Sequence, residues 1–362
     1  MSAALEAAAE AVRGAAREGA RLVPVAGGTK RAVAAPPGGP ARALELGGLS
    51  GVVEYDPAEL TFTAGAATPL AEIDAMLAAN GQHLPFDPPR LGEGGTIGGA
   101  VAAGVTGPCG FGAGVRDFVV GVRVIDGTGR VAAGGGRVVK NAAGFDLPKL
   151  MVGSLGRLGV LAELSLKVFP RPHATATVRF PAAGLAVGLE AVAALARGPL
   201  ALCALDLDAE GAVTARIGGD AELIGARAER LAGLLEPGGE PLADEAGHWE
   251  RARRFEWVGA GERLVVVPLA PRQVPALDGE LGREGLSRRY GLAANVAWIG
   301  WPRERTVAEL SATLAAHRLG GLALTGPPLE QPLLGIAAGA GGAFGRRVAA
   351  ALDPAGVFGG AR

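Results

Sequence analysis

Short apolar runs, rich in β-branched and aromatic residues and separated by glycine-rich turns, fill the first half of the chain. Such runs predict strands, and an alanine-rich stretch with interspersed acids at the start predicts a surface helix. The expected elements are a helix over 2–18; strands over 22–26, 51–56 and 60–66; a helix over 69–80; a hairpin over 119–135; a short helix capped by Asp146; and a strand over 159–169.

Turn and cap residues support several of these boundaries. Thr68 is placed to cap the second helix, Pro69 suits its first position, and Asn80–Gly81 supplies a stop. Asp126–Gly127 is a typical hairpin turn. The sequence Pro-Arg-Pro at 170–172 marks a boundary, beyond which the pattern changes.

The second half predicts an antiparallel sheet with helices on one face, because its first six elements follow the order β-α-β-β-α-β. All four tryptophans lie in this half, and no long-period repeat is evident. Thr306 and Glu309 predict a capping box for a late helix. The expected elements are strands over 173–180, 200–208, 212–218, 263–269, 295–301 and 322–326, and helices over 183–196, 221–235 and 306–321.

The composition is that of a folded globular protein. The chain has 362 residues, 49% of them hydrophobic, and a net charge of −1. This length favours two domains. A nucleic-acid-binding protein would show a basic excess, so that class is excluded.

Cysteine usage and hydropathy limit the cellular setting. Cys109 and Cys203 have no paired spacing, which disfavours a disulfide framework or a cysteine metal site and indicates a reducing compartment. Residues 94–115 carry no charge, but nine glycines and a proline make them a poor helix and not a membrane span. We expect a cytoplasmic protein without an integral membrane segment.

Three glycine-rich segments could each press backbone N–H groups against a phosphate. The first is Ala26–Lys30, where Thr29 adds a hydroxyl group and Lys30 a charge. The others are 94–104 and 153–160. Each has a plainer interpretation, a simple turn or glycine that allows close packing. Lys30 stands out because the chain has four lysines against 31 arginines.

Other cofactor motifs are absent. The first segment lacks the spacing of a Walker A loop. Residues 126–132 imitate a Rossmann fingerprint, but no helix is expected after Gly129 and the hairpin turn explains the glycines. None of the four histidines has a partner at metal-ligand spacing, so no metal site is expected.

Longer stretches of the sequence resemble a known family. The motifs "VAGGTK", "LPFDPP", "GGTIGGAVAAGVTGP" and "VKNAAGFDLPKLMVGSLGRLGVLAELSLKVFPRP" are similar to the vanillyl-alcohol-oxidase (PCMH-type) FAD-binding family, and within it to the small FAD-binding subunits of bacterial glycolate oxidase complexes. The resemblance covers residues 20–172 strongly and extends weakly to the end, "ALDPAGVFGGAR".

The resemblance implies the fold and the cofactor. It implies an α/β plus α+β protein: a two-lobed FAD-binding domain over 1–172, an α+β cap over 173–330, and a segment over 331–362 that returns to the first domain. It also implies that FAD is bound by Ala26, Gly27, Gly28, Thr29, Lys30, Gly95, Thr96, Gly98, Gly99, Gly104, Val105, Thr106, Lys140, Gly156, Gly159 and Val160.

Lys140 and Asn141 match a stretch near the flavin ring. A cation there could stabilise negative charge on the reduced ring. A surface salt bridge is the plain alternative for Lys140.

Departures from the family pattern refine these expectations. Covalently flavinylated relatives carry a histidine or cysteine at defined places near the flavin, and no such residue matches here, so we expect non-covalent FAD. The larger catalytic relatives carry a His-x-Gly-Asp-type cluster that is absent from residues 173–362. Gly359–Gly360 replaces the usual Asn-Pro, which puts the docking of the closing segment in doubt.

The resemblance implies an FAD-carrying subunit of a glycolate oxidase-type 2-hydroxyacid dehydrogenase complex, with a larger FAD-binding subunit and an iron–sulfur subunit as partners. Attachment to the inner face of the cell membrane would then come through these partners. Two alternatives stay open: a self-sufficient FAD-dependent oxidoreductase of a small alcohol or hydroxy acid, and a non-catalytic assembly subunit with structural FAD. The sequence identifies no catalytic residue.

Overall fold

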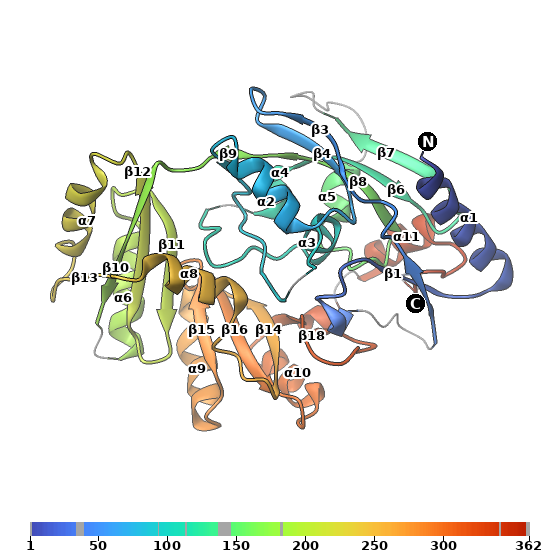
Figure 1. Cartoon of the computed structure of the whole chain (residues 1–362). Helices are drawn as coiled ribbons and strands as arrows, with labels where there is room; N and C mark the ends of the chain where they lie inside the picture. The colour runs from blue at the N-terminus through green and yellow to red at the C-terminus, as the bar shows by residue number, and fades with distance from the viewer. Residues whose placement is uncertain are drawn as a thin grey trace.

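The computed structural model describes residues 2–33, 40–92, 94–112, 114–136, 146–181, 184–339 and 342–359. It contains two large sheets in separate lobes, which Figure 1 shows at the upper right and the lower left. None of the helices in these ranges is long and apolar enough to cross a membrane.

The first lobe begins with a helix packed beside a two-stranded parallel sheet. Ser2 caps helix α1, because its side chain accepts a hydrogen bond from the Leu5 N–H. The buried side of α1 and strand β1 share an apolar cluster with the start of β8. The elements here are α1 (Ala3–Glu18), β1 (Leu22–Val25), a 3₁₀ turn η1 (Arg31–Val33) and β2 (Arg42–Glu45).

A five-stranded antiparallel sheet forms the rest of this lobe, in the order β3-β4-β8-β6-β7. The predicted hairpin is confirmed: β6 and β7 pair antiparallel and join through Asp126–Gly127. The elements are β3 (Val52–Asp56), β4 (Thr61–Gly65), α2 (Leu70–Ala78), β5 (Gln82–His83), α3 (Ile97–Ala103), α4 (Val115–Phe118), β6 (Val119–Ile125), β7 (Val131–Gly135), α5 (Leu147–Met151), β8 (Val160–Lys167) and β9 (Phe169–Pro170).

Two expectations for this lobe are wrong in detail. Thr68 does not cap α2; its hydroxyl donates to the Gly65 carbonyl at 2.7 Å, and Pro69 occupies the cap position. The glycine-rich stretch, expected to be a poor helix, contains α3. Thr96 caps that helix, and Gly98 fits because its missing Cβ would lie 2.6 Å from the Ala66 carbonyl oxygen. Tertiary packing thus overrides the low helix propensity of glycine.

The second lobe is one nine-stranded sheet in the order β13-β10-β12-β11-β15-β16-β14-β17-β18. The elements are β10 (Ala174–Phe180), α6 (Leu185–Ala196), β11 (Leu202–Asp208), β12 (Val213–Gly219), α7 (Ile224–Ala232), β13 (Glu240–Pro241), α8 (Glu245–Arg254), β14 (Glu262–Pro268), η2 (Pro271–Gln273), α9 (Val274–Arg283), β15 (Arg288–Gly291), β16 (Val296–Pro302), α10 (Val307–Ala316), β17 (Gly320–Ala323), β18 (Leu333–Gly335) and η3 (Ile336–Gly339). Helix α11 (Gly342–Leu352) follows in the closing segment of the chain. The predicted capping box of α10 is confirmed.

The order of strands shows that the split β-α-β-β-α-β unit occurs twice. In the first unit β13, only two residues long, pairs with β10 as the fourth strand. The strand over 263–269, expected to close this unit, instead begins a second one made of β14, α9, β15, β16, α10 and β17. The two units join edge to edge where β11 pairs with β15. The sequence hid the repeat because β13 is too short to give a hydrophobic pattern.

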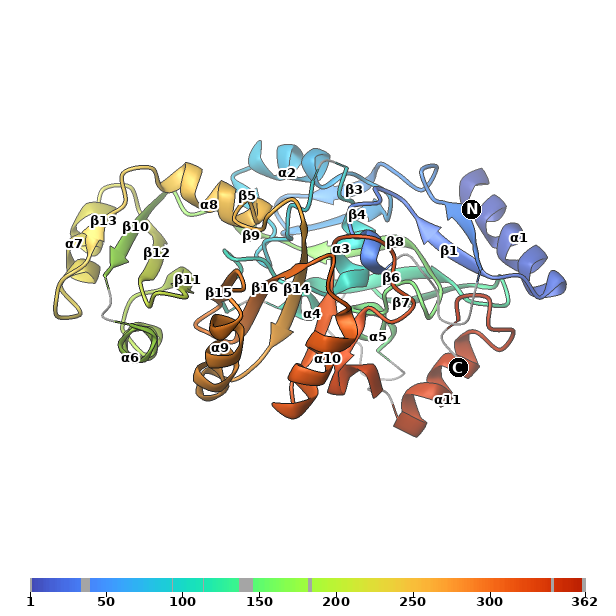
Figure 2. The same ribbon diagram turned by 90° about the horizontal axis from the view of Figure 1, so that it is seen from below.

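Side chains on the nine-stranded sheet alternate between two different environments. One face packs against α6, α7, α9 and α10, with Leu205, Val265 and Ile299 in its core. The other face turns toward α8 and the first lobe, and Leu264 and Trp298 lie there in a cluster with Ala103 of α3. Figure 2 shows α9 and α10 on the opposite side of β14–β16 from the first lobe.

The closing segment docks onto the first lobe, so the doubt raised by Gly359–Gly360 is not supported over the described residues. The Val357 carbonyl accepts from the Leu22 N–H at 2.8 Å. Asp353 is fully buried, and its carboxylate accepts from the N–H groups of Val357 and Phe358. Figure 1 shows α11 on the same side of the molecule as α1. The division at 172 and 330 stays a prediction.

Candidate functional site

A cleft in the first lobe lies between the end of β1, the start of α3 and the segment before β8. It encloses about 940 Å³, part of it open to solvent. Its lining residues are Val23, Pro24, Val25, Ala26, Gly27, Gly28, Thr29, Lys30, Arg31, Val33, Leu46, Ala66, Thr96, Gly98, Gly99, Ala102, Ala103, Leu155, Gly156, Gly159 and Leu161. No carboxylate and no histidine is among them.

The loop after β1 requires glycine at two adjacent positions for different reasons. A Cβ on Gly27 would lie 1.6 Å from the carbonyl oxygen of Gly94, so the two glycine-rich segments touch backbone to backbone. Gly28 has open space around it but a φ of +63°, in the left-handed region that glycine adopts without strain.

Four successive backbone N–H groups in this loop are free to bind a ligand. The amides of Gly27, Gly28, Thr29 and Lys30 donate to no acceptor among the described residues. Backbone N–H groups of this kind in a turn form an anion-binding concavity. The start of α3 differs, because the Ile97 and Gly98 amides already donate to the carbonyls of Thr68 and Ala66.

Lys30 adds a positive charge to the same loop. Its ammonium group has no ion-pair or hydrogen-bond partner in the part of the chain that the structure describes. Burial, and secondarily the nearby charge of Arg90, lower its pKa to about 8. An unpartnered and partly desolvated cation beside four free amides favours an anionic ligand.

The third glycine-rich segment closes the cleft opposite the loop. Gly156 has a φ of +72° and a Cβ there would lie 3.4 Å from Pro24 Cγ. Gly159 has a φ of +140°, and a Cβ there would lie 2.6 Å from the Ile125 carbonyl oxygen. Val160, the next residue, points away from the cleft into the cluster beneath α1.

The structure brings most of the predicted site residues together. Ten of them line the cleft: Ala26, Gly27, Gly28, Thr29, Lys30, Thr96, Gly98, Gly99, Gly156 and Gly159. Five lie outside the lining, namely Gly95, Gly104, Val105, Thr106 and Val160. Lys140, with its neighbour Asn141, falls outside the described residues, so its role stays a prediction.

The five outliers make contacts outside the cleft lining. The Gly95 carbonyl accepts from the Leu70 N–H, which anchors the loop before α3. Gly104 ends α3, and a Cβ there would lie 3.0 Å from the backbone of Gly153. Val105 belongs to the apolar cluster that the first lobe shares with the nine-stranded sheet of the second lobe. Thr106 packs close to Gly110, 2.3 Å from the position of a Cβ there.

Sequence reasoning missed the apolar part of the lining. Val23, Val25, Leu46 and Leu161 give the cleft hydrophobic walls. The strand patterns contained these residues, but a pattern does not tell which of them face a cleft and which face a core.

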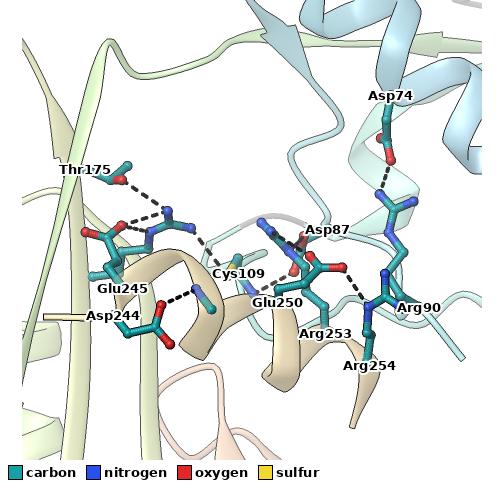
Figure 3. Close-up of polar contacts among 12 residues, drawn as sticks. Asp74, Asp87, Arg90, Cys109, Thr175, Asp244, Glu245, Glu250, Arg253 and Arg254 are labelled. Carbon is teal, nitrogen blue, oxygen red and sulfur yellow. Dashed lines mark hydrogen bonds and ion pairs between the residues drawn. The ribbon is translucent and has the colours of Figure 1, made fainter. Parts of the chain in front are cut away.

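A second polar cluster lies at the seam between the lobes, where α8 meets the loops after β5 and α3 (Figure 3). Asp87 is buried, and its carboxylate accepts from Arg253 Nε at 2.6 Å and from the Cys109 N–H at 2.9 Å. Burial alone would lower the pKa of Arg253, but Asp87 raises it above its usual value. Arg90 pairs with Asp74 beside them. Every charge in this cluster is matched.

Cys109 also belongs to the seam and not to the cleft. Burial is the main cause that raises the pKa of its thiol to about 12, and Arg216 lies 3.8 Å from its sulfur. A thiol of this kind is neutral and unreactive. Over the described residues, no three histidine, cysteine, aspartate or glutamate side chains gather as a metal site would require.

Comparison with known proteins identifies the first lobe. The family described as "FAD binding domain" matches residues 3–134. The first lobe is therefore an FAD-binding domain, and FAD is the cofactor of this chain.

Relatives with named activities each match about a third of the chain. The glycolate oxidase subunit GlcE of Escherichia coli is 54% identical over 130 residues, 36% of this chain and 37% of that protein. The glycolate oxidase subunit GlcD of Bacillus subtilis is 32% identical over 131 residues, 36% of this chain and 28% of that protein. A mitochondrial D-lactate dehydrogenase [cytochrome] of Arabidopsis thaliana is 35% identical over 113 residues, 30% of this chain and 19% of that protein. The matched region thus spans well under half of each relative.

The overall fold has a counterpart among solved structures. Alkyldihydroxyacetonephosphate synthase superimposes with a TM-score of 0.67 over 96% of this chain and 73% of that one, at 13% identity. The expected α/β plus α+β fold with an FAD-binding domain is confirmed.

Proposed function

We propose that this chain is the FAD-carrying subunit of a glycolate oxidase-type 2-hydroxyacid dehydrogenase complex. The observation that carries the proposal is the row of four free amides beside Lys30, which has no partner among the described residues, in a chain that is 54% identical over 130 residues to the glycolate oxidase subunit GlcE. FAD would supply the capacity to accept a hydride or electrons.

The chain's own residues divide the work of holding that cofactor. The amides of Gly27–Lys30 would bind the pyrophosphate, and the Lys30 ammonium would neutralise part of its charge. Thr96 and Gly98 hold the start of α3 against the loop, with the helix amides already satisfied internally. The apolar wall that includes Leu161 would keep water from one side of the bound cofactor.

The FAD is bound non-covalently in this proposal. Covalent attachment through cysteine needs a reactive thiol beside the flavin, and Cys109 is neutral and sits at the seam. Flavin should therefore leave the protein on acid precipitation. Flavin that stays in the precipitate would overturn the non-covalent assignment.

Partners complete the reaction. Oxidation of a 2-hydroxy acid needs a base for the hydroxyl proton, and the described residues that line the cleft include no carboxylate or histidine. Two cysteines also cannot ligate an iron–sulfur cluster. A larger FAD-binding subunit and an iron–sulfur subunit would supply both functions.

The test is purification of the chain from its native source with its companions. We expect those two subunits to co-purify, glycolate to reduce a dye through the assembled complex, and the isolated FAD-loaded chain to reduce it negligibly. Rapid turnover by the isolated chain would instead favour a self-sufficient oxidoreductase. Flavin that neither substrate nor partners reduce would favour an assembly subunit.

A further inference from the structure

A loop of the second lobe reaches the first lobe beside the cofactor cleft. It joins β17 to β18, comprises residues 324–332 and contains three prolines. None of its residues is among those that line the cleft. Its hydrogen bonds to the first lobe instead end on the two segments that form opposite walls of the cleft, residues 26–33 and 153–160. We call this loop the strap and these segments the first and second wall.

The strap is attached to the first wall at Leu329. The Leu329 N–H donates to the Ala32 carbonyl at 3.0 Å. Ala32 lies in η1, two residues after Lys30, and is fully buried. The Leu329 side chain packs against the apolar cluster that contains Ala32. This attachment therefore fixes the chain directly after the loop that carries Lys30 and the four free amides.

The strap is attached to the second wall through Arg157. Its Nη2 donates to the Glu330 carbonyl at 3.3 Å. Arg157 lies between Gly156 and Gly159, which both line the cleft. Burial lowers the pKa of the guanidinium, and its Nε is buried without a partner. In the described part of the chain the side chain reaches no other acceptor, so its placement depends on the strap.

The base of the strap is firmly held within the second lobe. Arg263 is 5% exposed, and its Nη1 donates to the carbonyls of Thr325 and Pro327 at 2.8 and 3.0 Å. The Ala323 N–H donates to the Pro332 carbonyl at 2.8 Å, which closes the loop. The prolines further restrict its backbone. A loop held in this way moves with β14 and β17.

Apolar packing follows the same route between the lobes. Val33 on the first wall and Leu155 on the second wall both line the cleft. Both pack against the same apolar cluster as Leu333, the first residue of β18 and the residue directly after the strap. Hydrogen bonds and apolar contacts thus join both walls to one segment of the second lobe. The walls cannot separate unless these attachments break.

We propose that the strap holds the two walls closed on bound FAD, and that its attachments at Leu329 and Arg157 must break before the cofactor leaves. Both are positioning residues, because neither lines the cleft and each acts through a wall that does. This inference rests on the proposed placement of FAD in the cleft. Since coupling between two sites is reciprocal, bound FAD should also stabilise the attached strap.

The first test measures how fast FAD leaves. The FAD-loaded chain is diluted, and free flavin is separated by ultrafiltration at intervals. Arg157→Gln removes the bond to the second wall, and Leu329→Ala removes packing at the first wall. We expect each variant to release FAD about fivefold faster than wild type, which is the loss of about one hydrogen bond or a few apolar contacts.

Matched controls separate this effect from a general loss of stability. Arg303→Gln also removes a bond to a backbone carbonyl, that of Glu262 at 3.0 Å, at an exposed site of the second lobe. Leu235→Ala trims a half-buried leucine that packs against the same cluster as Leu329. Both controls should release FAD at the wild-type rate. Wild-type release in Arg157→Gln and Leu329→Ala, or equal acceleration in the controls, would overturn the strap.

The second test needs no variant. Amide hydrogen exchange is compared between the empty and the FAD-loaded wild-type chain. The Leu329 N–H should exchange at least about threefold more slowly with FAD bound, because the strap then opens less often. The Ala323 N–H is the control, since its bond to Pro332 lies within the second lobe and should not change. Equal Leu329 exchange in the two forms would refute the coupling.

The outcomes also separate the strap from the proposed function. A chain that loads FAD, but whose FAD release does not respond to Arg157→Gln or Leu329→Ala, refutes the strap and leaves the FAD-subunit proposal intact. A chain in which Lys30→Met leaves FAD affinity unchanged refutes the placement of FAD in the cleft, and the strap with it.

Discussion

Lys30 in the cleft and Arg253 at the seam are both partly buried cations, yet their surroundings shift the two pKa values in opposite directions. Lys30 has no partner among the described residues, and burial lowers its pKa to about 8. Arg253 lies 2.6 Å from Asp87, which raises its pKa despite burial. The first site lacks an anion that the second already contains.

The difference separates binding from architecture. A buried charge that is already paired holds two segments of the chain together, as Asp87 and Arg253 join the two lobes. A charge left unpaired beside free amides costs stability in the empty protein, and a ligand can repay that cost. Each substitution below should therefore affect either cofactor affinity or the free energy of unfolding, but not both equally.

Gly27→Ala should have the largest effect. Its methyl group would collide with the Gly94 carbonyl, so the two loops must separate, at a cost of about 3 kcal/mol or more. We expect FAD binding to be lost in a fluorescence titration. Gly28→Ala is the control: it meets no atom and should cost only about 1–2 kcal/mol of backbone strain. Equal behaviour of the two variants would mean that the close loop contact does not matter.

Lys30→Met should weaken FAD binding by about 1.5–3 kcal/mol, because a charge-assisted hydrogen bond to phosphate is lost. The empty protein should be no less stable than wild type, and its midpoint in urea should stay or rise, since an unpaired cation has been removed. Lys30→Arg keeps the charge and should retain most of the affinity. A fall in the free energy of unfolding with unchanged FAD affinity would mean that Lys30 stabilises the fold, as Arg253 does, and does not bind the cofactor.

Arg253→Ala should give the opposite result. It leaves Asp87 buried without its cation, and we expect the free energy of unfolding to fall by about 2 kcal/mol in urea denaturation, with FAD affinity nearly unchanged. Arg251→Ala, on the same helix with its partner Asp244 exposed, should cost less than about 1 kcal/mol. Weaker FAD binding in Arg253→Ala would show that the seam also shapes the cleft.

The pH dependence is the smallest expected effect and the finest test. Lys30 has a lower pKa in the folded empty protein than in the unfolded chain, so its contribution to stability should rise with pH from about 8 to 10.5. FAD affinity should fall over the same range, because an anion binds the protonated lysine. Titrations at pH 7.5, 8.5 and 9.5 should show this fall in wild type and not in Lys30→Met. If FAD affinity changes with pH in the same way in wild type and in Lys30→Met, Lys30 does not bind the cofactor.

Local signals predicted much of the fold. The hairpin at Asp126–Gly127 and the capping box at Thr306 were correct because a turn or a cap is decided by residues a few positions apart. The resemblance to FAD-binding domains likewise located the loop at Gly27–Lys30. Ten of the residues predicted to bind FAD, this loop included, line the cleft.

Long-range packing decided the rest. Thr68 looked like a helix cap, but it bonds back to Gly65, and the glycine-rich stretch formed α3 because only a residue without a side chain can approach Ala66. The second β-α-β-β-α-β unit was invisible, because its identification depends on which strand pairs with β10.

By itself, then, the sequence determined where backbone turns and where glycine allows a close approach, since these depend on neighbouring residues. Only the tertiary structure decided which polar groups have partners. Lys30 and Arg253 cannot be told apart in a list of cations. Whether such a group is paired depends on residues far away in the chain, as Asp87 is from Arg253, and that pairing separates the groups that hold the lobes together from those that await a ligand.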